Sequence, residues 1–295
     1  MPWMLAGVSI DSAGVVGGTE LTPAALRKFS RLSQMVDVDH GDVVAPVHDK
    51  RRDPASGLVG HREVVAATQR IRDAFADWLA PNHRTVVLGG CCTLMIGLGA
   101  ATRDRIGRFG VAYIDGHLDL YDGHSSPWGE GADVPLATML GHGDQEVLNA
   151  AGGRSLDPQG VYLLGYRDAI QAKGHGSLMP EDFGPDFRHA DTLAIRSAGP
   201  AKVGAAARAH FKSQGLPFWL FLDVDALDPA AFPATDALID GGLDWDEMEA
   251  LTGPLAGSPN LLGVVTTCYN PEKDPDGACG RRLGRFLESV VEANP

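Results

Sequence analysis

The sequence has few cysteines, no long apolar run and too few basic residues to balance its acidic ones. Four cysteines in 295 residues cannot build a disulfide framework, so we expect a protein of the reducing cytoplasm. No apolar run reaches the roughly 18 residues that a membrane-spanning helix needs. The first residues lack the basic start and the long apolar stretch of a secretory signal, so we expect no such signal.

Charge and hydrophobicity narrow the class of protein further. The 25 Lys and Arg residues against 38 Asp and Glu residues give a formal net charge of −13. Such an acidic surface repels phosphate backbones, so we expect no nucleic-acid partner. Hydrophobic residues make up 44% of the chain and charged residues 21%, which is enough for a large core. We therefore expect a globular protein whose partner is a small molecule.

Short apolar runs alternate along the chain with segments of helical periodicity. Six of these runs are almost continuously apolar, as in strands that are buried on both faces of a parallel sheet. They are Trp3–Ile10, Arg84–Gly90, Gly110–Asp115, Gly160–Tyr166, Pro217–Asp223 and Asn260–Cys268. The expected helices are one that Thr22 caps and Pro23 begins, His61–Ala80, Lys202–Gln214, Trp245–Ala256 and Gly280–Ala293. This alternation predicts a single doubly wound α/β domain over residues 1–295.

Two stretches fit neither pattern and are expected to be loops. They are Asp37–Gly60 and Gly123–Ser155, and both are rich in Gly, His and Asp. Long loops at strand ends in this architecture usually carry function.

Reactive residues follow three of the expected strands. They are Cys91 and Cys92, then Asp115, His117 and Asp119, and finally Asp223 and Asp225. Ligands of open α/β sheets bind at the carboxyl ends of the strands, so these side chains could converge. Residues at alternate positions of an extended segment share a face, which favours a common orientation for each Asp and His set.

Four converging carboxylates would carry four negative charges, and two divalent cations would neutralise them. Carboxylates with one imidazole suit Mn²⁺ or a similar ion, and a water that bridges two such ions becomes a nucleophile. The alternative for a single Asp-x-Asp is a turn or a helix cap. The alternative for Cys91 and Cys92 is a pair of small buried apolar residues, and only one of these neighbours can face the cleft.

These motifs resemble those of the ureohydrolase superfamily, which contains arginase, agmatinase and formimidoylglutamase. The resemblance rests on Gly89-Gly90-Cys91-Cys92-Thr93, Asp115-Gly116-His117-Leu118-Asp119 and Leu222-Asp223-Val224-Asp225-Ala226-Leu227-Asp228-Pro229. It implies a three-layer α/β/α domain with a mainly parallel sheet, a trimer or hexamer, and two Mn²⁺ ions per subunit. It also implies hydrolysis of a linear C–N bond. The metal ligands that it implies are Cys92, Asp115, His117, Asp119, Asp223 and Asp225, with Asp119 also accepting the proton of the bridging water.

The sequence departs from the family pattern at five positions, the first of which is Cys91, where the family has the Asp that precedes the first His ligand. Cys92 stands at the first His ligand, where a softer thiolate would weaken one Mn²⁺ site or favour another divalent metal. Cys268 stands where the family places the carboxylate that grips the guanidinium. Ala132 replaces the His that shuttles protons, and Ile170 replaces the Asp that holds the α-amino group. The substitutes we expect are His124 for catalysis and Asp133 and Cys268 for substrate binding, and Glu130 or Glu272 could rescue guanidinium binding.

We therefore expect a metal-dependent hydrolase that uses a metal-bridging hydroxide on a guanidino-type small molecule. A modified, N-hydroxylated guanidine is one candidate substrate, because family relatives that act on N-hydroxylated arginine also place Cys at the first ligand. A non-guanidine amide or imidate is another. One alternative is a degenerate, non-catalytic member that binds a metal or a metabolite as a regulatory or scaffold subunit. A cysteine-nucleophile enzyme using Cys92 or Cys268 is a further alternative, for which no paired His is evident.

Overall fold

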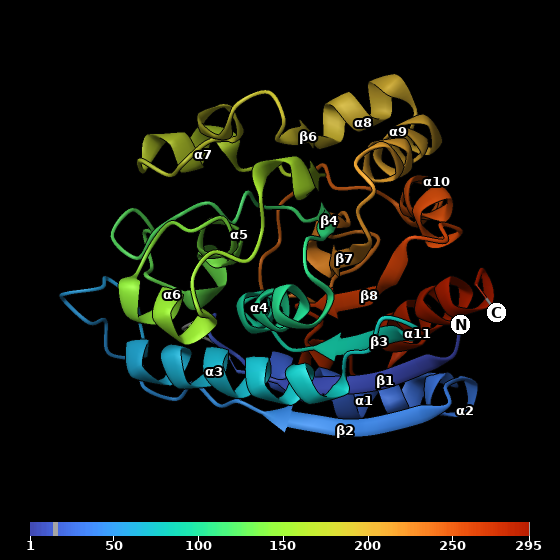
Figure 1. The fold of residues 1–295 in the computed structure, drawn as a ribbon, viewed down its shortest axis with the longest axis horizontal. Helices are drawn as coiled ribbons and strands as arrows, with labels where there is room; N and C mark the ends of the chain where they lie inside the picture. The colour runs from blue at the N-terminus through green and yellow to red at the C-terminus, as the bar shows by residue number, and fades with distance from the viewer. Residues whose placement is uncertain (14–16, 295) are drawn as a thin grey trace.

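The computed structural model describes residues 1–13 and 17–294, and it contains one eight-stranded sheet (Figure 1). Every pairing in the sheet is parallel, and the strand order is β2-β1-β3-β8-β7-β4-β5-β6. The strands are β1 (Trp3–Ser9), β2 (Val38–Val44), β3 (Arg84–Gly89), β4 (Gly110–Ile114), β5 (Val161–Leu164), β6 (Arg188–Ala190), β7 (Phe218–Asp223) and β8 (Leu261–Thr267). The prediction of a single α/β domain with a mainly parallel sheet is confirmed.

All six predicted strands are present, and two more strands form the edges of the sheet. The prediction that Asp37–Gly60 is only a loop is wrong, because β2 lies within it. Most residues of β2 are exposed or half-buried, and β6 spans only three residues. An edge strand pairs on one side and is covered less, so it does not need the continuous apolar run by which the inner strands were recognised.

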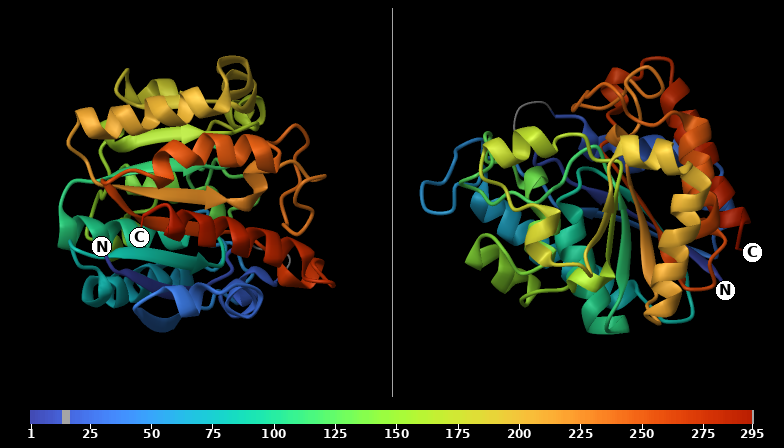
Figure 2. Two further views of the ribbon diagram at one scale, coloured as in Figure 1. Left: turned by 90° about the vertical axis from the view of Figure 1, so that its right-hand side faces the viewer. Right: turned by 90° about the horizontal axis from the view of Figure 1, so that it is seen from above.

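Helices cover both faces of the sheet and give the three layers that Figure 2 shows from two sides. Alternate residues of the inner strands point to opposite faces. Val87 of β3 belongs to the core on one face, and Val86 and Leu88 belong to the core on the other. The helices of the first face are α3 (His61–Trp78), α4 (Leu94–Ile106), α5 (Pro135–Met139), α6 (Gln145–Ala151) and α7 (Ala169–Gly174). Those of the second are α1 (Thr22–Phe29), α2 (Leu32–Met35), α8 (Thr192–Ala198), α9 (Pro200–Ser213), α10 (Trp245–Ala256) and α11 (Ala278–Glu292).

The predicted helices are present. Two predictions need correction: the N-cap of α1, and the assignment of Gly123–Ser155 to a loop. Thr22 does not cap α1, since Leu21 occupies the N-cap position and the Thr22 hydroxyl donates to the Tyr269 carbonyl. The prediction that Gly123–Ser155 is only a loop is wrong, because α5 and α6 lie within it. Helix α4 has no polar face for its first nine residues, which are all buried, so periodicity alone could not reveal it. Among the described residues no helix is both long and apolar enough to cross a membrane.

The strand order brings the reactive segments together. Strands β3, β8, β7 and β4 are consecutive neighbours and run in the same direction. Their carboxyl ends therefore lie at one edge of the sheet. These ends carry Cys92, Cys268, Asp223 and Asp115, although the residues are far apart in the sequence.

Gly90 allows the segment after β3 to approach the end of β1. Its N–H donates to the Val8 carbonyl at 2.9 Å, and the next N–H, of Cys91, donates to the Ile10 carbonyl at 3.1 Å. A Cβ at position 90 would lie 1.8 Å from the Ile10 carbonyl oxygen, which no side chain tolerates. The position of the two cysteines therefore depends on the absence of a side chain at residue 90.

We predict that Gly90→Ala lowers the free energy of unfolding by about 1–3 kcal/mol or more, because the backbone must shift to admit the methyl group. Gly174→Ala is the matched control, since nothing lies within 4 Å of a Cβ at that position. Urea unfolding followed by circular dichroism measures both. Equal unfolding free energies for the two variants would contradict the close approach.

Candidate active site

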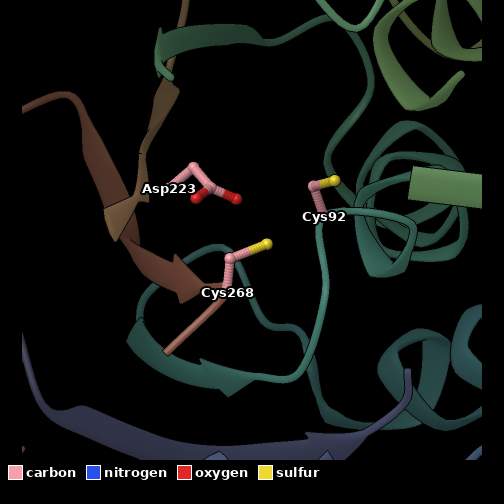
Figure 3. A group of neighbouring side chains, drawn as sticks. All are labelled: Cys92, Asp223 and Cys268. Carbon is pink, nitrogen blue, oxygen red and sulfur yellow. The ribbon is translucent and has the colours of Figure 1, made fainter. Parts of the chain in front are cut away.

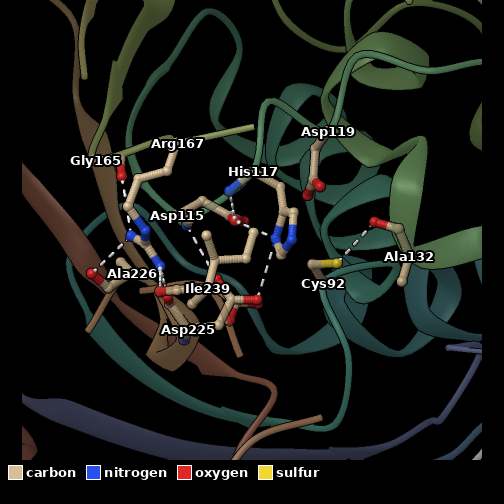
Figure 4. A network of polar contacts seen from close by, with 12 residues as sticks. Cys92, Asp115, His117, Asp119, Ala132, Gly165, Arg167, Asp225, Ala226 and Ile239 are labelled. Atoms are coloured by element: carbon tan, nitrogen blue, oxygen red, sulfur yellow. Dashed lines mark hydrogen bonds and ion pairs between the residues drawn. The ribbon is translucent and has the colours of Figure 1, made fainter. Parts of the chain in front are cut away.

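Asp115, His117 and Asp225 form the first group of facing side chains at this sheet edge. The His117 Nδ1 atom lies 3.2 Å from a carboxylate oxygen of Asp225 and 3.4 Å from one of Asp115. The ligand atoms of all three residues lie within 4.8 Å of one another, and Figure 4 shows them converging. Asp115 directly follows β4, and Asp225 comes two residues after the end of β7.

Backbone and hydroxyl donors fix the carboxylates of this edge. The Asp225 carboxylate accepts from the Gly116 N–H at 3.0 Å, which ties the end of β7 to the end of β4. Asp223 accepts from the Asp225 N–H at 3.0 Å and from the Thr267 hydroxyl at 2.7 Å. These donors hold the acids in place at the ends of β4 and β7.

Asp119 is held by Tyr113 and by an unusual backbone conformation. The Tyr113 hydroxyl donates to the Asp119 carboxylate at 2.6 Å. Asp119 has a φ of 53°, and Cys268 with 65° is the other non-glycine residue with a positive φ among those that the structure describes. Such strain in a non-glycine residue costs on the order of 1–3 kcal/mol and clusters at functional sites. Sequence reasoning missed Tyr113, whose place within a buried strand made it look like an ordinary core residue.

A second group consists of Cys92, Asp223 and Cys268, whose ligand atoms also lie within 4.8 Å of one another (Figure 3). The Cys92 thiol donates to the Ala132 carbonyl at 3.0 Å. Cys91 faces elsewhere, since its sulfur accepts from the N–H of Ser12 at 3.2 Å. The two cysteines therefore take separate roles, and Cys92 is the one that faces the acids.

Burial concentrates unfavourable negative charge at this edge. It raises the pKa values of Asp115, Asp119 and Asp223 well above the usual range of a carboxyl group, and neighbouring carboxylates add to the effect. Burial also acts on Asp225, but the His117 side chain outweighs it and lowers the pKa of that carboxyl. One oxygen of Asp115, Oδ2, is buried and has no hydrogen-bond partner. A cluster of this kind is stabilised by bound cations.

The comparisons with known proteins agree across the chain. The model of the Arginase family matches residues 2–289. An arginase of Staphylococcus aureus (strain MSSA476) is 30% identical over 238 residues, which cover 78% of this chain and 77% of the relative. An arginase of Brevibacillus brevis is 26% identical over 294 residues, covering 97% and 96%. This chain belongs to the arginase family. It is therefore a hydrolase that acts on carbon–nitrogen bonds other than peptide bonds.

Solved structures of the arginase fold superpose over the whole chain. The arginase from Bacillus caldovelox has a TM-score of 0.84 at 23% identity and covers 99% of this chain and 97% of its own. The proclavaminate amidino hydrolase from Streptomyces clavuligerus has a TM-score of 0.70 at 18% identity, covering 99% and 91%. At these identities the likeness establishes the fold alone.

The donor set fits the two Mn²⁺ ions of the arginase family only in part. Asp115, His117 and Asp225 offer carboxylate oxygens and an imidazole nitrogen, which suit Mn²⁺, and the unpartnered oxygen of Asp115 is available to it. The second group offers two sulfurs, which Mn²⁺ does not favour. The two halves of this arginase-family site therefore differ in chemical character.

The other residues that the sequence suggested for substrate handling belong to neither group. The His124 ring nitrogen Nε2 contacts the Ala55 carbonyl at 3.0 Å on an exposed loop. Ile170 is 92% exposed, and Glu272 is also exposed. Asp133 is half-buried beside Ala132 and accepts from the Ser126 hydroxyl.

Arg167 and Asp168 follow β5 and were not identified as site residues from the sequence. The Arg167 guanidinium donates to backbone carbonyls of Asp225 at 2.6 Å and Ala226 at 3.2 Å, which fixes the loop after β7 (Figure 4). Asp168 is buried, and its Oδ1 atom has no hydrogen-bond partner. The position of both residues at a strand end was the signal that could have found them.

We predict that Glu130 makes the stability of the metal-free protein depend on pH. Burial, together with the Asp133 and Asp11 carboxylates, raises the pKa of Glu130 to about 8. In the unfolded chain the group loses its proton near pH 4.3, so the unfolded state binds fewer protons between these values. The contribution of Glu130 to the free energy of unfolding therefore falls as pH rises from about 4.3 to 8.

The variant Glu130→Gln cannot take up this buried charge. We expect it to match the wild type below about pH 5 and to be the more stable protein above about pH 8. Urea unfolding across this range measures the difference, with Glu181→Gln as the control on an exposed residue. Two curves that stay parallel at every pH would show that Glu130 is not responsible.

Proposed function

We propose that this chain is a metal-dependent hydrolase of a guanidino carbon–nitrogen bond whose preferred substrate is an N-hydroxylated guanidine. The observation that carries the proposal is the combination of an intact acidic cluster with a thiol at position 268. Asp115 and Asp225 lie beside His117, and both acids and Asp223 are buried, which supports a hydrolytic role for this half of the site. Cys268 supplies no carboxylate for a guanidinium.

The residues that would hold divalent cations are the acids at the ends of β4 and β7, with His117. When bound, two such cations would polarise a water held between them and lower its pKa towards neutrality, so that it becomes the nucleophile. Asp119 is suited to receive the proton of the attacking water, because Tyr113 fixes one of its oxygens and leaves the other available. Burial of Asp119 and its neighbours excludes further water from the reaction.

The proton that the leaving amine needs must come from another group. Of the two candidates from the sequence, Asp133 directly follows Ala132, whose carbonyl accepts from the Cys92 thiol at 3.0 Å. Burial raises the pKa of Asp133, which favours its protonated form. His124 would have to leave the Ala55 carbonyl to take part. We therefore assign Asp133 to substrate binding. His124 could carry the proton only if its loop changed conformation.

The thiol at Cys268 sets the preference among guanidines. A neutral thiol cannot pair with a guanidinium as a carboxylate does, and loss of such a charged partner costs roughly 3–5 kcal/mol. An N-hydroxyguanidine is less basic, so it suffers less from this loss, and its oxygen can bind a cation. The missing contacts also favour a second candidate, a non-catalytic member that only binds a metal or a metabolite.

The family relationship supports two further parts of the proposal. We expect a cytoplasmic protein, in keeping with the four free cysteines. We also expect a homo-oligomer, either a trimer or a hexamer. Light scattering of the purified protein tests the assembly.

We predict that Asp119→Ala and Asp225→Ala each weaken metal binding by about 100-fold or more and abolish hydrolysis, because each removes a charge that balances the cations. Asp77→Ala, on the exposed face of α3, is the control and should bind metal normally. Elemental analysis of dialysed protein gives the metal content. Full metal content in both site variants would refute a metal centre at this edge.

We predict that N-hydroxyarginine is hydrolysed about 10²–10³ times more efficiently than arginine, the factor that follows from a missing charged partner. The assay compares kcat/KM for arginine, agmatine, guanidinobutyrate, formiminoglutamate and N-hydroxyarginine under saturating Mn²⁺. Efficient release of urea from arginine would contradict the role given to Cys268. Metal binding without turnover of any compound would favour the non-catalytic candidate.

A further inference from the structure

Two sulfurs and a carboxylate meet beside the acidic cluster and share no residue with the group of Asp115, His117 and Asp225. Cys92 follows β3, Cys268 follows β8 and Asp223 ends β7, so three adjacent strands each contribute one side chain. Their ligand atoms lie within 4.8 Å of one another. In Figure 3 the Cys268 sulfur and the Asp223 carboxylate lie on the side towards Cys92, whose sulfur points away from them, towards the Ala132 carbonyl that accepts from it at 3.0 Å.

The backbone brings the two cysteines close together. The Cys268 N–H donates to the Gly90 carbonyl at 2.7 Å, which joins the end of β8 to the end of β3 just before the two adjacent cysteines. Cys268 has a φ of 65°, a left-handed conformation that a cysteine rarely adopts. Cys92 is only 4% exposed. The chain thus holds a buried thiol and a half-buried thiol together, the second of them in a strained backbone conformation.

We propose that Cys92, Cys268 and Asp223 bind a thiophilic divalent cation, Zn²⁺, beside a harder site at Asp115, His117 and Asp225. Thiolates select Zn²⁺, whereas carboxylate and imidazole donors suit Mn²⁺. The inference deepens the proposed function and rests on it in one respect, that this edge of the sheet is a metal centre. Cys268 then serves as a metal ligand and not as a substrate contact, which changes the role expected from the sequence.

The geometry is close to what a zinc site needs. With Zn–S bonds of about 2.3 Å, the ligand atoms of a tetrahedral site lie about 3.8 Å apart. The ligand atoms of the three residues lie within 4.8 Å of one another, so side-chain rotations would have to bring them to this spacing when the cation binds. Three protein ligands leave a fourth position open, as in catalytic zinc sites.

Charge and proton balance are also satisfactory. Each thiol gives up its proton to solvent when the cation binds, so two protons leave for one Zn²⁺. Two thiolates and the Asp223 carboxylate carry three negative charges, and the cation neutralises two of them. No oxidant or reductant takes part, because Zn²⁺ has no redox chemistry.

The first experiment uses the metal-free full-length protein and titrates it with Co²⁺, whose thiolate complexes absorb strongly in the near ultraviolet. We expect a sulfur-to-cobalt charge-transfer band that saturates at one ion per chain and disappears on addition of Zn²⁺. Incubation with equal amounts of Mn²⁺ and Zn²⁺ should leave one of each per chain after gel filtration. A cobalt spectrum without the thiolate band would overturn the proposal.

Variants then assign the band to residues. Cys92→Ser and Cys268→Ser should each weaken Zn²⁺ binding by about 100-fold or more and reduce the band, because each removes one thiolate ligand. Cys279→Ser is the control, since Cys279 is a half-buried free cysteine outside both groups of ligands. Circular dichroism confirms that each variant folds. An unchanged band in either site variant would exclude that cysteine as a ligand and overturn the proposed site.

A double variant tests selectivity in the opposite direction. Cys92→His combined with Cys268→Glu replaces both sulfurs by nitrogen and oxygen donors, so we expect the preference of this site for Zn²⁺ over Mn²⁺, measured as the ratio of the two dissociation constants, to fall about 10-fold or more. An unchanged ratio in this variant would contradict the role of the thiols.

The result is separable from the proposed hydrolase activity. A thiolate band and mixed metal content with no turnover would support the zinc site and refute the hydrolase. Turnover of N-hydroxyarginine by a protein that gives no thiolate band would refute the zinc site and support the hydrolase.

Discussion

The constraint on which this structure depends is the burial of several carboxylates at one edge of a parallel sheet. Burial raises the pKa values of Asp115, Asp119 and Asp223, so without compensation the cluster resists ionisation. Most of the polar contacts around it serve to compensate: His117 faces Asp225, Tyr113 donates to Asp119, and backbone N–H groups donate to the remaining acids. Divalent cations would complete the compensation, which is why the fold and the proposed chemistry cannot be separated.

The site has two halves with different chemistry. The half at the end of β4 contains oxygen and nitrogen donors, as expected of an arginase-family metal centre. The half at the ends of β3 and β8 contains the sulfurs of Cys92 and Cys268. These sulfurs change which metal the site prefers and how well it binds a positively charged substrate. These two changes are linked in space, since both cysteines lie close to Asp223. A single physical cause, the exchange of hard donors for soft ones, thus accounts for the departures in both metal binding and substrate contact.

Positioning depends on residues that take no part in the chemistry. Gly90 permits the close approach of the β3 segment to β1, and its carbonyl accepts from Cys268. Arg167 joins the end of β5 to the loop after β7 through backbone carbonyls. The left-handed conformations of Asp119 and Cys268 persist because the surrounding contacts hold them. A site made from four strand ends needs such connections, since each segment alone would be a mobile loop.

The sequence by itself determined the inner strands, because strands covered on both faces must be continuously apolar. It also determined the Asp and His motifs, because each directly follows such a strand. It could not determine the edge strands β2 and β6, which are less covered, or the helix α4, whose first nine residues are buried and show no polar face. Tertiary structure alone decided that Cys268 lies beside Cys92 and Asp223. That contact depends on β8 lying between β3 and β7, and strand order arises from the packing of the whole sheet, which no local pattern of residues records.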